Sequence, residues 1–451
     1  MTKNGRKLLI LFAIRAESIY NLSQHRFYSN DREWGLDEKF IASSNKDAPR
    51  LFYGYVIVFV AFSLQVFGWG IFNSFGVFFK PLETEFVWSR AVVSSAMSFG
   101  FLVAGFASIL MGELSDRFGP RLIMTGGGVL LGLGYLLMST VSALWEYYLY
   151  CTVIIGIGIS GTDVVVLSTT ARWFIKKRSM LTGIIKVGTG VGMMVMPLFI
   201  NRLVTNYGWR TSFLILGVII LIFYVALSQC LVRDPAKMGL SPDGVKDEEP
   251  ANHTSVEVGL TIKEAVRTSQ LWKICAVYSF LMFSIATIMF HIVPIAIDLG
   301  ISAANAANVL ATLGTVSIAG RFVMGAAGDK IGTKSSLVIC FLFLLSGLIW
   351  LQFSTTLWML LLFAVIHGFA HGGFFALISP LLADFFGTRS HGAIFGVLTF
   401  ISGIGSAVGP VMAGYMFDTT GSYERVFLVL TGMSIAGLVA TFSLKPIIRE
   451  S

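Results

Sequence analysis

The chain has 451 residues, of which 55% are hydrophobic and only 13% are charged. A soluble globular protein carries about 25% charged residues, so this composition excludes that class and indicates a protein solvated by lipid. The formal net charge of +8 comes largely from basic residues in loops between apolar segments. That distribution relates the charge to membrane topology and not to nucleic acid.

Twelve apolar segments follow one another from Tyr53 to Leu444, and each is long enough to cross a hydrocarbon core of about 30 Å as a helix. They contain Gly and Leu without the alternating polarity of a porin strand, and backbone groups in lipid need internal hydrogen-bond partners. The predicted fold is therefore all-α, with twelve transmembrane helices. Their ranges are 53–79, 91–111, 121–143, 145–169, 179–201, 210–232, 272–296, 303–327, 335–354, 356–382, 391–416 and 424–444.

Polar segments divide this series into two equal parts. We expect an N-terminal tail at 1–52, six-helix bundles at 53–232 and 271–446, a linker at 233–270 and a C-terminal tail at 447–451. Basic residues gather in alternate loops, so the positive-inside rule places both tails and the linker in the cytoplasm. We assign no function to the N-terminal tail.

A ten-residue pattern after the second segment returns after the eighth, 213 residues later (329 minus 116). The copies read Gly112-Glu-Leu-Ser-Asp116-Arg117-Phe-Gly119-Pro-Arg121 and Gly325-Ala-Ala-Gly-Asp329-Lys330-Ile-Gly332-Thr-Lys334. The chain is therefore duplicated, which predicts two pseudo-symmetric six-helix bundles. Asp116 and Asp329 can receive helix amides or guanidinium groups, and the basic residues can form breakable ion pairs with the opposite bundle. We expect the numbered residues of both copies to form a conformational latch.

The repeated loop resembles the signature Gly-x-x-x-Asp-Arg-x-Gly-x-Arg of the major facilitator superfamily, and the resemblance covers about residues 53–446. It implies a secondary transporter that binds substrate between its two halves near the middle of the membrane. It also implies that the latch holds the outward-facing state and parts when the cytoplasmic side opens.

Two further stretches resemble narrower branches of that family. Residues 172–192, which begin Arg172-Trp-Phe174-Ile-Lys176 and continue with spaced glycines, are similar to the signature of the monocarboxylate porters. Residues 233–244 and His291-Ile-Val-Pro294 look more like bacterial relatives, including oxalate/formate exchangers. The resemblance implies transport of a small organic anion, such as lactate or pyruvate, with a proton, in a cell membrane of the bacterial inner-membrane type.

Other classes of function are less well supported by the sequence. Oxalate/formate-type exchange is the alternative within transport, and a transporter-like membrane sensor is a third interpretation. No nucleophile, metal cluster or phosphate loop indicates an enzyme or a cofactor. The expected partners are the anion, protons and the lipid bilayer, with no nucleic acid and no obligatory protein partner.

Ionisable residues inside apolar segments cost several kcal/mol unless they face a cavity or a partner. Arg321 lies eight residues before Asp329, which places it about 12 Å inside the membrane on its helix. The resemblance implies that this arginine pairs with the substrate carboxylate, since a guanidinium binds carboxylates with two hydrogen bonds. A structural cation that extends toward the interface is the alternative.

Asp163 and Lys186 reach nearly the same depth on neighbouring antiparallel segments and are able to pair. The pair can exchange partners when a proton or an anion arrives, or it can be permanently neutralised and serve packing. Both interpretations are open.

Three histidines complete the set. His291 lies near the outer end of its segment, and His367 and His371 share one helix face; each can relay a proton or serve packing.

Asn73 stands where the monocarboxylate porters carry a lysine, and Ser317 where they carry an acid. The candidate substrate-binding residues are Arg321, Lys186, Asn73 and His291, and the proton-coupling candidates are Asp163, His367 and His371. No metal site is predicted. The segment at 391–416 has no lysine that would supply a second cation for a dicarboxylate such as oxalate, which favours a singly charged substrate.

Overall fold

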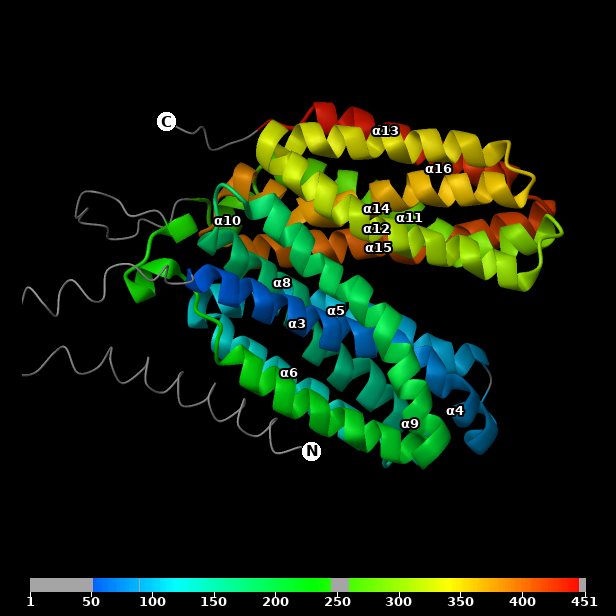
Figure 1. The fold of residues 1–451 in the computed structure, drawn as a ribbon, viewed down its shortest axis with the longest axis horizontal. Helices are drawn as coiled ribbons and strands as arrows, with labels where there is room; N and C mark the ends of the chain where they lie inside the picture. The colour runs from blue at the N-terminus through cyan, green and yellow to red at the C-terminus, as the bar shows by residue number, and fades with distance from the viewer. Residues whose placement is uncertain (1–51, 89, 245–258, 446–451) are drawn as a thin grey trace, which may run out of the picture. The chain divides into compact units, whose positions relative to one another are not determined.

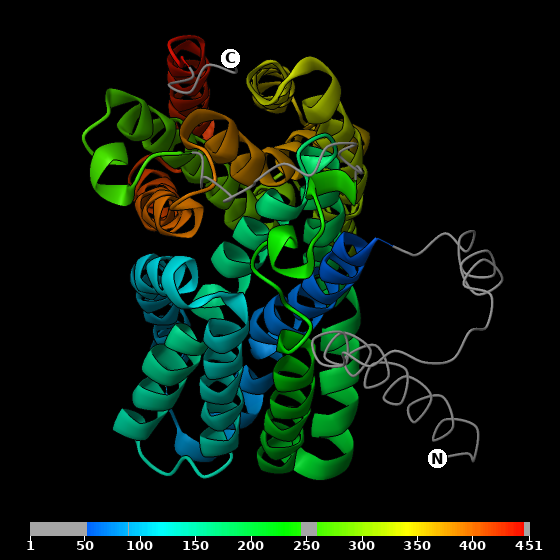
Figure 2. The ribbon, with the colours of Figure 1, turned by 90° about the vertical axis from the view of Figure 1, so that its left-hand side faces the viewer.

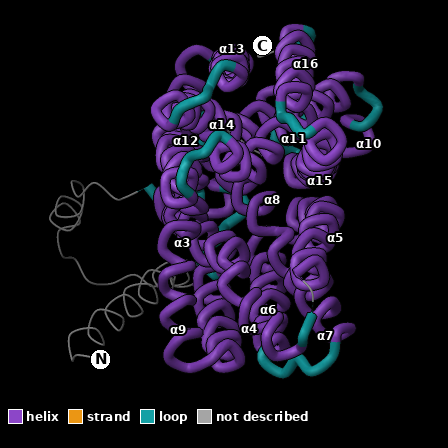
Figure 3. The backbone as a smooth tube through the Cα atoms, turned by 90° about the vertical axis from the view of Figure 1, so that its right-hand side faces the viewer, coloured by secondary structure: helices purple, strands orange, loops and turns teal. Residues whose placement is uncertain are grey.

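The computed structural model describes residues 52–88, 90–244 and 259–445 of the chain. The predicted tails therefore lie outside the described residues, except for Phe52, and the linker is described at its two ends. Phe52 to Ser451 form one compact unit. Within the described ranges the backbone is helical, apart from loops and one isolated antiparallel bridge between Gly259 and Gly387 (Figure 3).

The first half of this unit begins with α3. A 3-10 turn, η1, joins α3 to the short α4, and the π-type turns of η2 join α7 to α8. The elements are α3 (Tyr53–Asn73), η1 (Ser74–Phe78), α4 (Phe79–Phe86), α5 (Arg90–Phe118), α6 (Pro120–Met138), α7 (Leu144–Tyr148), η2 (Leu149–Ile155), α8 (Gly156–Trp173) and α9 (Arg178–Ser228).

The second half follows the linker, which contributes three short helices. These are η3 (Pro235–Met238), η4 (Pro242–Gly244) and α10 (Ile262–Ala265). The long helices are α11 (Ser269–Asp298), α12 (Ala303–Ile331), α13 (Thr333–Gln352), α14 (Leu357–Phe386), α15 (His391–Thr420) and α16 (Glu424–Phe442).

The twelve predicted crossings are present, although two of them belong to one element. Eleven described helices are long and apolar enough to span a membrane, and α9 alone has 51 residues. At Gly208 the backbone takes φ 76°, a conformation that glycine adopts without a Cβ penalty. The two arms of α9 meet there, so this element supplies the fifth and sixth crossings.

A polar cluster fixes the bend of α9. Arg210, just past Gly208, donates to the carbonyls of Ser139 and Val141 and pairs with Glu85 of α4 at 2.6 Å. The indole of Trp209 also donates to Glu85, at 2.7 Å. The hydrogen bond from Trp209, followed by that from Arg210, holds the pKa of the Glu85 carboxyl below its usual value. The cluster ties α4 and the end of α6 to the second arm of α9.

The helices form two bundles, α3 to α9 and α11 to α16 (Figures 1 and 2). In the first bundle α3 and α6 pack on α9, and in the second α12 and α13 pack on α14 while α11 packs on α15. The bundles meet mainly through two helix pairs, α5 with α15 and α9 with α12. We call the end of the unit that contains Gly119, residues 174–177, Gly332 and residues 387–390 the basic end.

Glycines let the two bundles touch near the basic end. A methyl group at Gly112 of α5 would overlap the carbonyl oxygen of Gly392 on α15. At the corresponding place in the repeat, a methyl group at Gly325 of α12 would lie 2.7 Å from the carbonyl oxygen of Ser179 on α9. Backbone-to-backbone contact of this kind requires residues without side chains.

Replacing Gly112 with alanine should therefore destabilise the contact between the bundles. Overpacking costs about 1–3 kcal/mol, so we expect Gly112→Ala to lower the apparent Tm of the purified protein by several degrees. Thermal unfolding in detergent, followed by tryptophan fluorescence, measures this. Gly126→Ala is the matched control, because a methyl group there meets nothing within 4 Å. Equal Tm values for the two variants would contradict the packing described.

Candidate functional site

A buried ion pair lies between α8 and the first arm of α9. The Lys186 ammonium is 2.7 Å from Oδ1 of Asp163, and their side chains are 6% and 20% exposed. The depths predicted from the sequence thus bring the two charges into contact. Because a buried charge without a partner is costly, this contact lets each residue compensate the charge of the other.

Arg321 reaches the same place from α12, in the opposite bundle. Its Nη1 donates to the backbone carbonyl of Lys186 at 2.7 Å, the residue is buried, and its Nε has no hydrogen-bond partner. Two glycines of α9 make room for this approach. A methyl group at Gly190 would lie 3.1 Å from Nη1, and one at Gly183 would overlap the Arg321 carbonyl. One cation of the second bundle therefore joins the ion pair of the first.

Phe375 of α14 covers these cations, and sequence reasoning missed it. Its ring centre is 5.5 Å from Nζ of Lys186 and 6.0 Å from Cζ of Arg321, within the range of cation–π attraction. His371, one turn earlier, meets the same ring edge to face at 5.2 Å. Nothing in the sequence distinguishes this phenylalanine from the 37 others, since its role depends on how α14 faces α9 and α12.

Gln65 of α3 is the second residue that sequence reasoning missed. It is fully buried, its Nε2 donates to Oδ1 of Asp163 at 2.7 Å, and its Oε1 accepts the Thr189 hydroxyl at 2.7 Å. The available signal was an amide side chain inside an apolar segment, where an unpaired polar group is costly. The site therefore draws on α3, α8, α9, α12 and α14.

Two predicted substrate-binding residues have other partners. Asn73 is exposed, and its amide donates to the carbonyl of Trp69 at 2.7 Å; it lies eight residues beyond Gln65, about 12 Å along α3. The His291 ring is held 3.0 Å from the Pro410 carbonyl through Nε2 and 3.0 Å from the Tyr423 hydroxyl through Nδ1. Among the described residues, neither side chain contacts the ion pair.

The two histidines of α14 lie in different surroundings, since His367 is buried and His371 is partly exposed. His367 is completely buried, and neither of its ring nitrogens has a hydrogen-bond partner. Nδ1 of His371 is likewise unpaired, but that ring adjoins Phe375. No group of three His, Cys, Asp or Glu side chains in the described part of the chain is placed to hold a metal ion.

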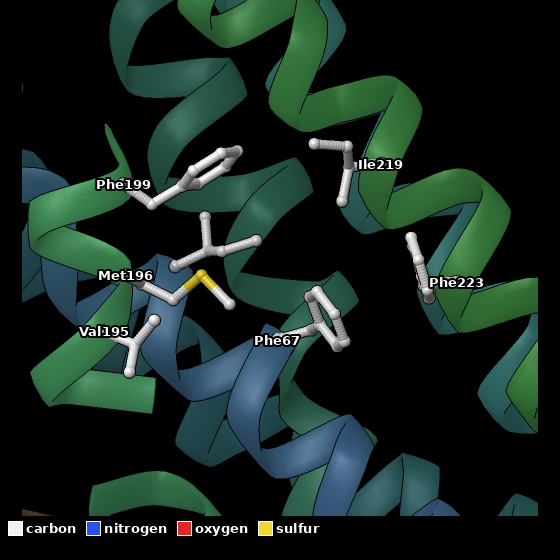
Figure 4. A pocket seen from close by; sticks show the side chains of 7 residues that line it. Phe67, Val195, Met196, Phe199, Ile219 and Phe223 are labelled. Carbon is white, nitrogen blue, oxygen red and sulfur yellow. The ribbon is translucent and has the colours of Figure 1, made fainter. Parts of the chain in front are cut away.

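One cavity lies elsewhere, between α3 and the two arms of α9 (Figure 4). Its volume is about 280 Å³, and it is partly open. Because only apolar side chains line it, the cavity offers no group to bind an anion. Its lining residues are Phe67, Ile71, Val195, Met196, Phe199, Ile219 and Phe223.

At the basic end, each bundle presents an aspartate to the first turn of a helix in the other bundle. Asp116 of α5 accepts the amides of Gly392 at 3.3 Å and Ala393 at 3.0 Å, where α15 begins. Asp329 of α12 accepts the amides of Ser179 at 2.7 Å and Met180 at 2.9 Å, where α9 begins. A carboxylate at a helix N-terminus satisfies unpaired amides and the helix dipole. The two contacts are related by the repeat.

The cations at these contacts differ from those expected. Arg172 pairs with Asp116 at 2.7 Å and donates across to the Thr388 carbonyl at 3.0 Å, and Arg178 pairs with Asp384 of the other bundle at 3.3 Å. Both arginines lie outside the repeated pattern.

Among the described residues, the basic residues of the pattern itself form no ion pair with the other bundle. Lys334 donates to the Phe442 and Leu444 carbonyls at the end of α16. Arg117, Arg121 and Lys330 form no ion pair with a described residue. All three side chains are exposed. The glycines Gly119 and Gly332 instead form the turns, with φ 92° and 86°.

Two six-helix bundles that share a buried charged site and meet at one end through paired acid-to-helix contacts define a two-bundle membrane transporter. The chain belongs to the Major Facilitator Superfamily, whose sequence profile matches residues 55–316 and 274–450. It is a multi-pass membrane protein, and its relatives are transporters and not enzymes.

Several relatives of known name are monocarboxylate transporters. Monocarboxylate transporter 7 of Homo sapiens is 27% identical over 444 residues, covering 86% of this chain and 85% of the relative. Monocarboxylate transporter 12 of Rattus norvegicus is 27% identical over 407 residues, covering 84% and 82%.

Solved structures agree on the fold. The human organic anion transporter MFSD10 (TETRAN) superposes with a TM-score of 0.68 at 15% identity, covering 88% of this chain and 100% of that one. The fucose:proton symporter FucP of E. coli gives 0.66 at 14% identity, covering 87% and 99%.

The acid contacts predict a measurable effect on closure of the basic end. Asp116→Asn removes an ion pair and weakens a helix cap, a loss of about 1–2 kcal/mol, which should raise exposure of the interface roughly 5- to 30-fold. The measurement is the thiol-labelling rate of Ser108→Cys, whose site is buried between α5 and α15, in a background with the four native cysteines replaced by serine. Glu113→Gln, an exposed acid on the same helix, should leave the rate unchanged. A rate unaltered by Asp116→Asn would contradict the role of this contact.

Proposed function

We propose that the protein is a secondary active transporter that carries a small monocarboxylate, such as lactate or pyruvate, together with a proton by alternating access. The observation that supports it is the buried guanidinium of Arg321, which has an unpaired Nε and lies beside a neutralised Asp163–Lys186 pair. The names of the relatives, which are monocarboxylate transporters, point to the same substrate class.

The guanidinium has one edge suited to a carboxylate. Nη1 is engaged by the Lys186 carbonyl, whereas Nε has no partner, so the edge formed by Nε and Nη2 remains for a planar anion. Two parallel hydrogen bonds to this edge give both affinity and orientation. Phe375 then lies where the short apolar part of a lactate-like or pyruvate-like molecule can contact it.

The charge count favours one carboxylate over two. Lys186 is compensated by Asp163, which leaves Arg321 as the single uncompensated cation of the cluster. While Asp163 is ionised, a monocarboxylate neutralises Arg321, whereas a dicarboxylate would bring a second negative charge into a low-dielectric site without a partner. This argument favours the monocarboxylate proposal over oxalate-type exchange.

The distribution of the cross-bundle contacts suggests the direction of access. If the basic end is cytoplasmic, as the positive-inside rule indicates, the acid contacts of Asp116 and Asp329 close the cytoplasmic side, and both termini lie in the cytoplasm. Substrate then enters from outside, and the two contacts act as the latch that parts when the bundles rock. We propose a cell membrane of the bacterial inner-membrane type, because residues 233–244 and His291-Ile-Val-Pro294 look like those of bacterial relatives.

Transport by purified protein in liposomes tests the proposal. We expect labelled lactate or pyruvate to accumulate when the outer buffer is acidic, and we expect Arg321→Lys to reduce uptake at least about tenfold. That variant keeps the charge but loses the two-pronged hydrogen bonding, a loss of about 1.5–3 kcal/mol. Arg202→Lys, at an exposed arginine of α9, is the control and should transport like the wild type.

Two results would overturn parts of this proposal. Normal uptake by Arg321→Lys would place the anion elsewhere. Uptake driven by an internal anion, and not by acid outside, would identify an exchanger in place of a proton symporter.

A further inference from the structure

We propose that Gln65 is the positioning residue that presents Asp163 as the proton site of the transport cycle, and that the proton binds at Oδ2 of Asp163. This inference deepens the proposed function and rests on it. It assigns a role to an amide that carries no charge and lies two turns from the position of Asn73.

The orientation of Gln65 is determined by three contacts to two other elements. Its Nε2 donates to Oδ1 of Asp163 at 2.7 Å and lies 3.4 Å from the Thr162 carbonyl, both on α8. Its Oε1 accepts the hydroxyl of Thr189 on α9 at 2.7 Å, three residues after Lys186 on the same helix face. Since the side chain is fully buried, these partners leave it one useful orientation.

Gln65 and Lys186 both donate to the same oxygen of Asp163. Oδ1 receives the amide and the ammonium, each at 2.7 Å, whereas Oδ2 has no hydrogen bond to a described residue. A proton from water can therefore form an O–H bond at Oδ2 while both contacts on Oδ1 persist. The same O–H bond breaks, and the proton returns to water, when the site opens on the other side.

Access distinguishes Asp163 from the buried histidine of α14. The Asp163 side chain is 20% exposed, so part of it is not covered by protein atoms. His367 is fully buried among apolar groups and has no partner on either nitrogen, so a proton placed there would be a buried charge without compensation. Asp163 is thus the better placed of the two for a proton that must enter and leave.

The charges of the cluster make proton and anion binding depend on each other. Asp163, Lys186 and Arg321 carry one net positive charge when the site is empty. An anion alone brings the sum to zero, a proton alone brings it to two positive charges, and both together restore one. Because like charges in a low-dielectric site repel, each ligand favours binding of the other. The empty and the fully loaded carrier also have the same buried charge.

The remaining titratable groups near Asp163 do not change this count. They are Tyr224 from the second arm of α9 and His371 from α14, both counted as uncharged. The Tyr224 hydroxyl lies between Thr162 and Leu64, and the His371 ring adjoins Phe375.

The pH dependence of transport measures the role of Gln65. Gln65→Leu removes a donor to the ionised carboxylate, so protonation becomes easier, and the pH of half-maximal uptake should rise by about one unit. Thr189→Val frees the same amide and should shift the midpoint in the same direction by less, which keeps the test informative if Gln65→Leu folds poorly. Gln352→Leu, an exposed glutamine on α13, is the matched control and should leave the midpoint unchanged.

Infrared difference spectroscopy between acid and neutral pH gives a readout that needs no transport. The carbonyl-stretch band of a protonated carboxylic acid should be present in the wild-type protein, absent in Asp163→Asn, and displaced to higher pH in Gln65→Leu. If wild-type liposomes take up no monocarboxylate while this titration is found, the proposed function fails and the proton site stands. If Gln65→Leu lowers the rate without moving either midpoint, Gln65 is only structural and the inference is wrong.

Discussion

The burial of three charges in a lipid-solvated bundle is the constraint on which the rest of the structure depends. Asp163 and Lys186 compensate each other at 2.7 Å, and the Arg321 guanidinium adds a cation whose Nη1 donates to the Lys186 carbonyl. Removing such charges from water costs several kcal/mol each unless partners are provided. Of the surrounding helices, α3 supplies the Gln65 amide as a partner and α14 supplies the covering ring of Phe375.

Close helix approach is what allows this cluster to span two bundles. Gly183 and Gly190 on α9 have no side chain that would keep Arg321 of α12 away from the Lys186 backbone. The same device operates at the basic end, where Gly112 meets Gly392. The contacts that join the bundles are therefore backbone packing and a few polar bonds. Interfaces of that kind part and re-form more readily than an interdigitated apolar core, which suits rocking of one bundle against the other.

The site also shows how a chain can depart from the pattern of the family branch that it resembles. Asn73 and Ser317 occupy the positions where that branch carries a lysine and an acid. In this structure the Asn73 amide bonds the Trp69 carbonyl and the Ser317 hydroxyl bonds the Gly314 carbonyl, each within its own helix. A lysine and an acid are nevertheless present, on α9 and α8. The same combination of charges thus stands at the interface of the bundles, supported by different helices and by the amide of Gln65.

The sequence by itself determined the number of crossings, the duplication and the depth of Asp163, Lys186 and Arg321, because hydropathy, repeated glycines and residue spacing along a helix are local properties. It did not determine which side chains meet across helices. Only the tertiary structure decided that Gln65 and Phe375 join the site and that Asn73 and His291 bond elsewhere. It also decided that Arg172 and Arg178, and not the basic residues of the repeat, reach across the bundles. Those contacts depend on how each helix is rotated about its axis and on how closely glycines let it approach, which no single segment specifies.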